Sequence, residues 1–325
     1  MRTGTRICAL VSGVLCALFA SAGWTQTYPT KPIRLIVAVP PGGAADVTAR
    51  IVGQKFTEAF GQNVVIENRG GAGGTIASDI VSKATPDGYT LLWSSSTTHG
   101  VGPVLYSKLP YDALKDFTHI GLATSLPMYV VAHVSVPANS VKELIALAKA
   151  RPDTLHFYSS GSGGMPHLVG EMFKAATGAP IVHVPYKGSG PGVVDLAAGN
   201  VQLAFDSLPS VYGQIKAGRL KLLAAVGKNR SSVFPELPSL AELGYAQVDG
   251  TVWYGISGPA RIPKPVVSRI STELGKVLAM PDVKERFGQQ GAIPTFLSPE
   301  QFVAFMKAEW AKWGPIVKAT GARVD

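Results

Sequence analysis

Loops rich in glycine and serine are the parts of this sequence whose residue types could do chemistry. Residues 40–44 and 159–164 each follow a short apolar run and lead into a segment with helical spacing. The start of a helix offers unpaired backbone N–H groups and the positive end of the helix dipole, both of which favour an anion. Glycine lets the backbone come close to a ligand, and serine and threonine hydroxyls donate to a carboxylate. These loops therefore predict reversible binding of a small anion by mostly neutral donors.

Four titratable side chains beside these loops have more than one interpretation. Lys187, in a third glycine-rich loop at residues 185–191, is the one cation in these loops and either touches ligand or is solvated. His167, in the first turn of a predicted helix, either contacts ligand or caps and packs locally. Asp46 and Asp206 could act as acid and base groups. We expect instead that Asp46 complements the helix dipole and accepts N–H groups of its own loop, and that Asp206 caps or lines the end of a strand.

Other chemistries lack their sequence motifs. No G-x-x-x-x-G-K-[ST] occurs, and residues 71–76 lack the last glycine of G-x-G-x-x-G, so no nucleotide is expected. The six histidines include no i, i+4 pair that would hold zinc on a helix. Residues 160–164 do not have the G-x-S-x-G spacing of a serine hydrolase. We expect no cofactor, no metal and no enzyme activity; the alternative is a periplasmic hydrolase that uses Ser160, Ser162 or Asp206.

Units of strand, loop and helix must position these loops. Apolar runs occur at residues 33–39, 90–93, 155–158, 181–184 and 201–205. Their alternation with helical patterns predicts parallel sheets covered by helices, in which the carboxyl ends of the strands face a ligand crevice. Gly61 and Gly178 are expected to end the helices that follow the two anion-binding loops. Toward the C-terminus we expect two helices, one through residues 267–278 and one that begins at the N-cap Ser298.

Two long, extended and apolar stretches, residues 121–133 and 248–258, are interpreted as crossings between two lobes. The chain is longer than one hydrophobic core usually serves. We therefore predict an α/β protein of two lobes, each a mainly parallel sheet flanked by helices. Lobe 1 would combine residues 27–125 with 248–325, and lobe 2 would hold residues 126–247.

The N-terminus has the pattern of an export signal. Arg2 and Arg6 precede an apolar run over residues 7–22, which is too short to span a bilayer and ends in small residues. We predict a signal peptide over residues 1–22, cleaved near Ala22, and a periplasmic protein.

Composition constrains the mature chain further. Cys8 and Cys16 lie inside the predicted signal peptide, so the mature chain would carry no thiol, disulfide or cysteine metal ligand. Loss of Arg2 and Arg6, with no acidic residue before Ala22, lowers the formal net charge from +9 to +7. The basic residues are scattered, which disfavours a nucleic-acid surface and allows weak steering of anions at most.

Six short motifs together resemble the tripartite tricarboxylate transporter receptors, also called Bug proteins. They lie, in the family's order and spacing, at residues 28–33, 41–46, 68–74, 86–92, 184–191 and 234–239. The resemblance implies the two-lobed Venus flytrap fold of periplasmic binding proteins, with residues 40–46 and 160–167 pinching the ligand's carboxylate. It also implies delivery of the solute to a membrane permease of two other subunits. Members of the family take di- and tricarboxylates, amino acids, nicotinate and aromatic acids.

One position departs from the family pattern. Val39 stands where an aromatic residue is common, and Ala38 where proline is usual; we hypothesise that the lost ring makes room for a bulkier or differently shaped acid. Residue chemistry and resemblance together give the candidate ligand-binding residues Val39, Pro41, Gly42, Gly43, Ala44, Asp46, Ser95, Thr97, Ser160, Gly161, Ser162, Gly163, Met165, His167, Tyr186, Lys187 and Asp206. We expect a monomer that binds a small carboxylate, with a ligand-dependent sensor partner as the alternative to a transport receptor.

Overall fold

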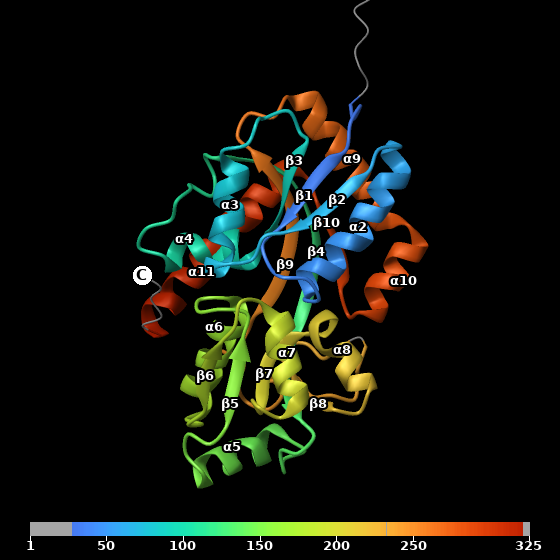
Figure 1. Cartoon of the computed structure of the whole chain (residues 1–325). Coiled ribbons are helices and arrows are strands. Elements are labelled where there is room, and N and C mark those ends of the chain that lie inside the picture. The colour runs from blue at the N-terminus through green and yellow to red at the C-terminus, as the bar shows by residue number, and fades with distance from the viewer. Residues whose placement is uncertain (1–27, 232, 321–325) are drawn as a thin grey trace, which may run out of the picture. The chain divides into compact units, whose positions relative to one another are not determined.

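The computed structural model describes residues 28–231 and 233–320 (Figure 1). From Lys31 onward, the described chain forms one compact unit. The predicted signal peptide, with Cys8 and Cys16, lies outside the described residues. Among the helices of the described residues, none is long and apolar enough to cross a membrane.

The first sheet has the strand order β2-β1-β3-β9-β4, and β10 also pairs with β4. Its strands are β1 (Ile33–Val37), β2 (Val64–Asn68), β3 (Thr90–Ser95), β4 (Phe117–His133), β9 (Thr251–Pro259) and β10 (Ile293–Leu297). Strand β1 runs parallel to β2 and β3, whereas β9 is antiparallel to both β3 and β4. Strand β1 ends at Val37, earlier than the apolar run predicts, which leaves Ala38 and Val39 in the loop that follows.

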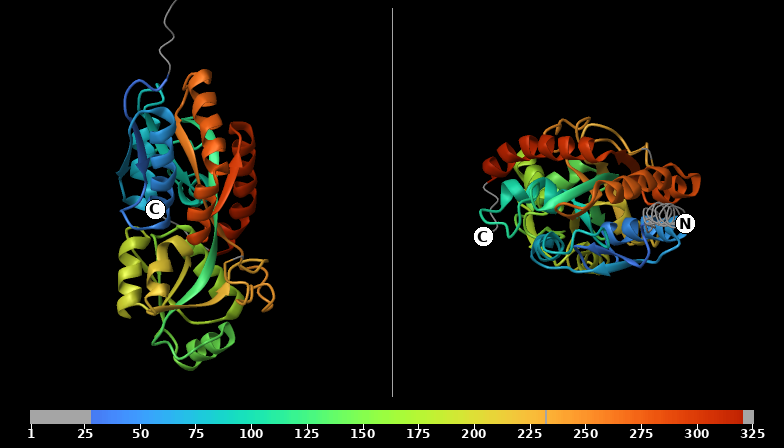
Figure 2. Two further views of the ribbon diagram at one scale, coloured as in Figure 1. Left: turned by 90° about the vertical axis from the view of Figure 1, so that its right-hand side faces the viewer. Right: turned by 90° about the horizontal axis from the view of Figure 1, so that it is seen from above.

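The second sheet shares β4 with the first and continues in the order β4-β7-β5-β6, with β8 also paired to β4. Its other strands are β5 (His156–Ser159), β6 (Val182–Pro185), β7 (Leu203–Ser207) and β8 (Leu220–Ala225). Strand β4 pairs with β9 as far as Pro127 and with β7 from Met128 onward. Figure 2 shows this long strand, in green, extending from one group of strands into the other. The predicted crossing at residues 121–133 lies within β4, and the lobe boundaries stay a prediction.

Helices cover both sheets. Their bounds are α2 (Ala44–Phe60), η1 (Ala72–Gly74), α3 (Thr75–Ser82), η2 (Ser96–Val101), α4 (Gly102–Leu105), α5 (Val141–Ala150), α6 (Met165–Thr177), α7 (Ser189–Ala198), α8 (Leu208–Lys216), α9 (Lys264–Ala279), α10 (Pro281–Gln289) and α11 (Pro299–Thr320). Helix α2 packs against β1 and β2, α9 and α11 pack against β4, and α6 packs against β5 and β7. The protein thus has an α/β fold with two mixed sheets, in which parallel pairing is confined to the outer strands.

Local signals in the sequence set the helix ends. Helix α2 ends at Gly61, whose φ of 63° is left-handed and whose N–H donates to the Thr57 carbonyl oxygen at 3.1 Å. Helix α6 ends in the same way at Gly178. Before α11, Ser298 Oγ accepts from the Gln301 N–H at 3.3 Å, and Gln301 Oε1 accepts from the Ser298 N–H at 3.0 Å. This is the predicted capping box.

The C-terminal part holds more elements than the two predicted helices, which correspond to α9 and α11. Helix α10 and strand β10 were missed. Helix α10 is polar and buries only Val283 and Phe287, and β10 contains Pro294 and shifts its register against β4 before Leu297. Each segment offers few apolar residues to the sequence pattern, and contacts of α10 with α9 and of β10 with β4 stabilise them.

Candidate functional site

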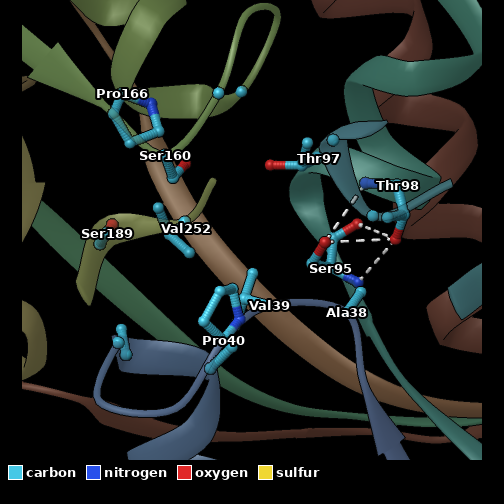
Figure 3. A pocket seen from close by; sticks show the side chains of 18 of the residues that line it. Ala38, Val39, Pro40, Ser95, Thr97, Thr98, Ser160, Pro166, Ser189 and Val252 are labelled. Atoms are coloured by element: carbon cyan, nitrogen blue, oxygen red, sulfur yellow. Dashed lines mark hydrogen bonds between the residues drawn. The ribbon is translucent and has the colours of Figure 1, made fainter. Parts of the chain in front are cut away.

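A cavity of about 120 Å³ lies between loops of the two sheets (Figure 3). Its wall consists of segments that follow β1, β2, β3, β5 and β6, together with residues of β3, β7 and β9. In Figure 3, Pro40, Thr97, Ser160 and Ser189 reach the cavity from four separate segments. One buried water needs only about 10–15 Å³. The cavity therefore has room for a small organic molecule, at the strand ends where α/β folds hold ligands.

The predicted site residues divide into two groups. Those that line the cavity are Val39, Gly43, Ala44, Ser95, Thr97, Ser160, Gly161, Tyr186, Lys187 and Asp206. Those that do not line it are Pro41, Gly42, Asp46, Ser162, Gly163, Met165 and His167. Contact of the first group with a ligand stays a prediction, and the second group belongs to the same loops and helix starts without lining the cavity.

Asp46 organises its own loop. Its carboxylate accepts the Gly42 N–H at 3.1 Å and the Asn68 side-chain amide at 3.0 Å, and it pairs with Arg50 at 2.8 Å. Burial raises the pKa of Asp46, but the hydrogen bonds from Arg50, Asn68 and Gly42 outweigh it, and the pKa is lowered overall. Gly42 has a φ of 92°, which other residues rarely adopt, so the turn that brings its N–H to Asp46 requires glycine. The expected local role of Asp46 is therefore confirmed.

His167 and its neighbours support the second loop from behind. The Gly163 N–H donates to His167 Nδ1 at 3.0 Å, and the His167 ring stacks on His183 with centroids 4.0 Å apart. Met165 is fully buried, and Ser162 is exposed. Of the two interpretations of His167, the structure supports local capping and packing.

Three helices begin at the cavity. The first residues of α2 (Ala44 and Ala45) and α7 (Ser189), and Pro166 near the start of α6, all line it. In each helix the first-turn N–H groups have no acceptor within the helix. Helix α2 follows β1 of the first sheet, whereas α6 and α7 follow strands of the second. Positive helix ends from both sheets thus converge on one small space, which favours an anion there.

The two sheets also touch beside the cavity. The Ala44 N–H donates to Ser210 Oγ of α8 at 3.3 Å. At Gly190, in the first turn of α7, an added Cβ would lie 2.9 Å from the Pro41 carbonyl oxygen. Gly188 has a φ of 105°, and a Cβ added there would lie 2.7 Å from Pro40 Cδ. Glycine at these positions lets the loop before α7 pack directly on the loop before α2.

Asp206, at the end of β7, places a buried carboxyl on the wall. Its side chain is 2% exposed and accepts from Tyr158 Oη at 2.8 Å and from the Ser207 N–H at 2.7 Å. Burial raises the pKa of Asp206, while hydrogen bonds from Ser189, Tyr158, Ser207 and Ser210 oppose the rise. Because each of these partners donates, the geometry fits a carboxylate ion. The expectation that Asp206 lines the end of its strand is confirmed.

Several lining residues were not among the candidates. They are Ala38, Pro40, Ala45, Gly71, Ala72, Gly73, Gly74, Trp93, Ser96, Thr98, Gly164, Pro166, Gly188, Ser189, Val252 and Tyr254. The hydroxyls of Ser96, Thr98 and Ser189 lie within two residues of candidates that were named, so a longer list of candidates would have included them. No local signal marks Trp93 or Tyr254, because both lie within apolar strands.

The first sheet supplies a rigid hydroxyl-rich wall. Ser95 and Thr98 form a capping box at the start of η2, in which Ser95 Oγ accepts from the Thr98 N–H at 3.2 Å (Figure 3). Trp93 and Tyr254 stack beside it with centroids 6.1 Å apart. Within residues 28–231 and 233–320, no group of three His, Cys, Asp or Glu side chains could hold a metal ion.

Two α/β sheets that share a strand and enclose a small cavity define the class of periplasmic binding proteins, and solved structures agree. BugD, a periplasmic binding protein, is 34% identical, with a TM-score of 0.86 over 91% of this chain and 99% of that one. An R. palustris protein solved with adipate is 33% identical, with a TM-score of 0.89 over 91% of this chain and 100% of that one. The two-lobed fold expected from the sequence is confirmed.

The chain belongs to the tripartite tricarboxylate transporter family of receptors, whose model matches residues 48–322. BugT from Bordetella pertussis is 37% identical over 323 residues, which cover 98% of this chain and 99% of BugT. The resemblance to Bug proteins is therefore confirmed. Members of the family are solute-binding receptors and not enzymes, so the expectation of no catalysis is confirmed and the hydrolase alternative is wrong.

Proposed function

We propose that this chain is a periplasmic receptor that captures a small carboxylate in the cavity and delivers it to a tripartite transporter with two membrane subunits. The observation that carries the proposal is the convergence of three helix N-termini, from both sheets, on that cavity. Family membership supports the transport role, and the adipate in the R. palustris relative supports a carboxylate as the ligand.

The strength of such a site suits reversible capture. Hydrogen bonds to a charged group contribute about 1.5–3 kcal/mol each. A few of them approach the roughly 8 kcal/mol of a micromolar complex. Within the described lining, Lys187 carries the only positive charge, so neutral donors supply most of the binding. A receptor that must release its solute needs this moderate affinity.

Two features of the proposal concern the whole chain. We propose that lobe 1, residues 27–125 with 248–325, and lobe 2, residues 126–247, close on the ligand; the change of partner along β4 at Pro127 supports this division. The N-terminal export pattern and the similarity to BugD, a periplasmic binding protein, support a periplasmic location. We further propose a monomer, which light scattering after gel filtration would test.

Calorimetric titration with a panel of carboxylates tests the proposal, after bound solute has been removed by unfolding and refolding. Wild type should bind at least one acid with a Kd in the micromolar range. Ala45→Glu puts a carboxylate at the start of α2 on the cavity wall and should weaken that acid at least about tenfold. Gln54→Glu makes the same charge change on the exposed side of α2 and should leave the Kd unchanged. Absence of binding to every acid at millimolar concentration would show the proposal to be wrong.

A further inference from the structure

Two side chains of the cavity wall have buried polar atoms without a partner. Trp93 is 1% exposed and Ser96 is fully buried, and both line the cavity. Among the described residues, Trp93 Nε1 and Ser96 Oγ are buried side-chain atoms for which no hydrogen-bond partner is found. Trp93 belongs to β3 and Ser96 begins η2, so one short segment presents both groups.

The chemistry of the two groups indicates what would satisfy them. An indole N–H only donates, and a serine hydroxyl both donates and accepts. A buried polar group in a native protein is nearly always paired, and leaving one unpaired is costly. Both atoms lie just behind the cavity surface, so a solute oxygen at this wall would accept from them when the wall side chains turn toward it.

The charge around this wall favours an uncharged oxygen. Tyr254 stacks on Trp93, and burial together with the nearby charge of Asp206 raises the pKa of Tyr254 above its usual value. Asp206 itself lines the same cavity as Trp93 and Tyr254. At the helix N-termini, three helix dipoles offset that charge for one carboxylate of the solute. At Trp93 and Ser96 the donors are neutral, so a second carboxylate would meet Asp206 without such compensation.

We propose that Trp93 and Ser96 form a second subsite, the Trp93 subsite, for an uncharged oxygen acceptor in the part of the solute remote from its carboxylate. The solute class is a carboxylate that also carries a keto, hydroxy or amide oxygen, in preference to a di- or tricarboxylate. This inference rests on the proposed function, since it takes the helix N-termini as the site of the first carboxylate.

Calorimetry on refolded, solute-free protein tests the subsite with straight-chain acids of four to six carbons. Each length is compared as the unsubstituted acid, the oxo acids and the dicarboxylic acid. At the best length the oxo acid should bind about tenfold more tightly than the unsubstituted acid, as expected for a hydrogen bond to otherwise unpaired donors. The dicarboxylic acid should bind more weakly than the oxo acid.

Two tryptophan variants separate the subsite from general packing. Trp93→Phe keeps an aromatic ring but removes the N–H, so the preference for the oxo acid over the unsubstituted acid should fall to about twofold or less. Trp253→Phe is the matched control on β9. Its N–H donates to Glu309 at 3.1 Å and the side chain does not line the cavity, so the preference should stay as in wild type. Ser96→Ala should lower the preference in part, and thermal melts confirm that each variant folds.

The outcomes distinguish failure of the Trp93 subsite from failure of the proposed receptor function. A wild type that binds oxo and unsubstituted acids equally, or a dicarboxylic acid most tightly, overturns the Trp93 subsite and leaves the receptor function intact. A preference that survives Trp93→Phe also overturns it. Failure of every acid to bind wild type removes the proposed function itself, and the subsite with it.

Discussion

Gly190→Ala isolates the contact between the two loops that flank the cavity. Gly190 lies in the first turn of α7 without a positive φ, so alanine is compatible with its backbone and improves helix propensity by up to about 1 kcal/mol. The obstacle is in the other sheet, because the new Cβ would lie 2.9 Å from the Pro41 carbonyl oxygen. The substitution is therefore tolerated within lobe 2 and opposed only where that lobe meets lobe 1.

The magnitude follows from this distance. Ordinary contact begins at 3.4 Å, so the loops must move apart by about 0.5 Å, the difference between 3.4 and 2.9 Å. Overpacking of this kind costs about 1–3 kcal/mol. If the solute is held with the loops in contact, affinity falls by about 5- to 140-fold, since about 1.4 kcal/mol is tenfold.

Calorimetry and thermal melting give the assay. For Gly190→Ala we expect a weaker Kd for the best acid and an unchanged or slightly higher Tm without solute. Gly213→Ala is the control, because its Cβ would meet no atom within 4 Å and it lies inside α8. It should raise Tm and leave the Kd alone. A Kd that is the same for Gly190→Ala and wild type would refute the reasoning.

Two further predictions concern stability. Asp46→Asn removes the carboxylate oxygen that accepts from Gly42 and Arg50 and should lower the free energy of unfolding by about 1–2 kcal/mol in chemical denaturation at pH 7. Because the pKa of Asp46 is lowered in the folded chain, this loss should shrink as the pH falls through that pKa. An equal loss of stability at acid pH would contradict the prediction. His119 is buried, and burial lowers its pKa to about 4. The unfolded chain binds the proton below about pH 6.5 and the folded chain does not, so His119 should cost up to about 3 kcal/mol of stability between pH 6.5 and 4. In His119→Gln the unfolding midpoint should depend less on pH over that range, and an unchanged slope would contradict the assignment.

The loops that we propose to bind the anion could be predicted from the sequence because their signals are local. A strand, a glycine-rich turn and a helix start lie within about ten residues of one another, and the chemistry of a helix N-terminus does not depend on its partners. Pro40, Ala44 and Ser160 therefore stood in or beside loops whose purpose the sequence already indicated. The direction of individual side chains was not accessible: Asp46 and His167 turn to their own loops because the Gly42 and Gly163 N–H groups are nearer than the cavity.

The remote wall depends on pairing between strands far apart in the chain. Strand β3 pairs with β9 so that Ser95 lies opposite Tyr254 and Trp93 opposite Ile256, and this register alone brings Tyr254 onto Trp93. The sequence of an apolar strand does not show whether its tryptophan N–H donates to a glutamate, as in Trp253, or is buried without a partner among the described residues, as in Trp93. The sequence therefore supports the proposed carboxylate site, while the composition of the remote wall depends on the register of two distant strands. Val39 lines the same cavity in place of the family's usual aromatic residue, and the hypothesis that its smaller side chain makes room for a bulkier or differently shaped acid stays a prediction.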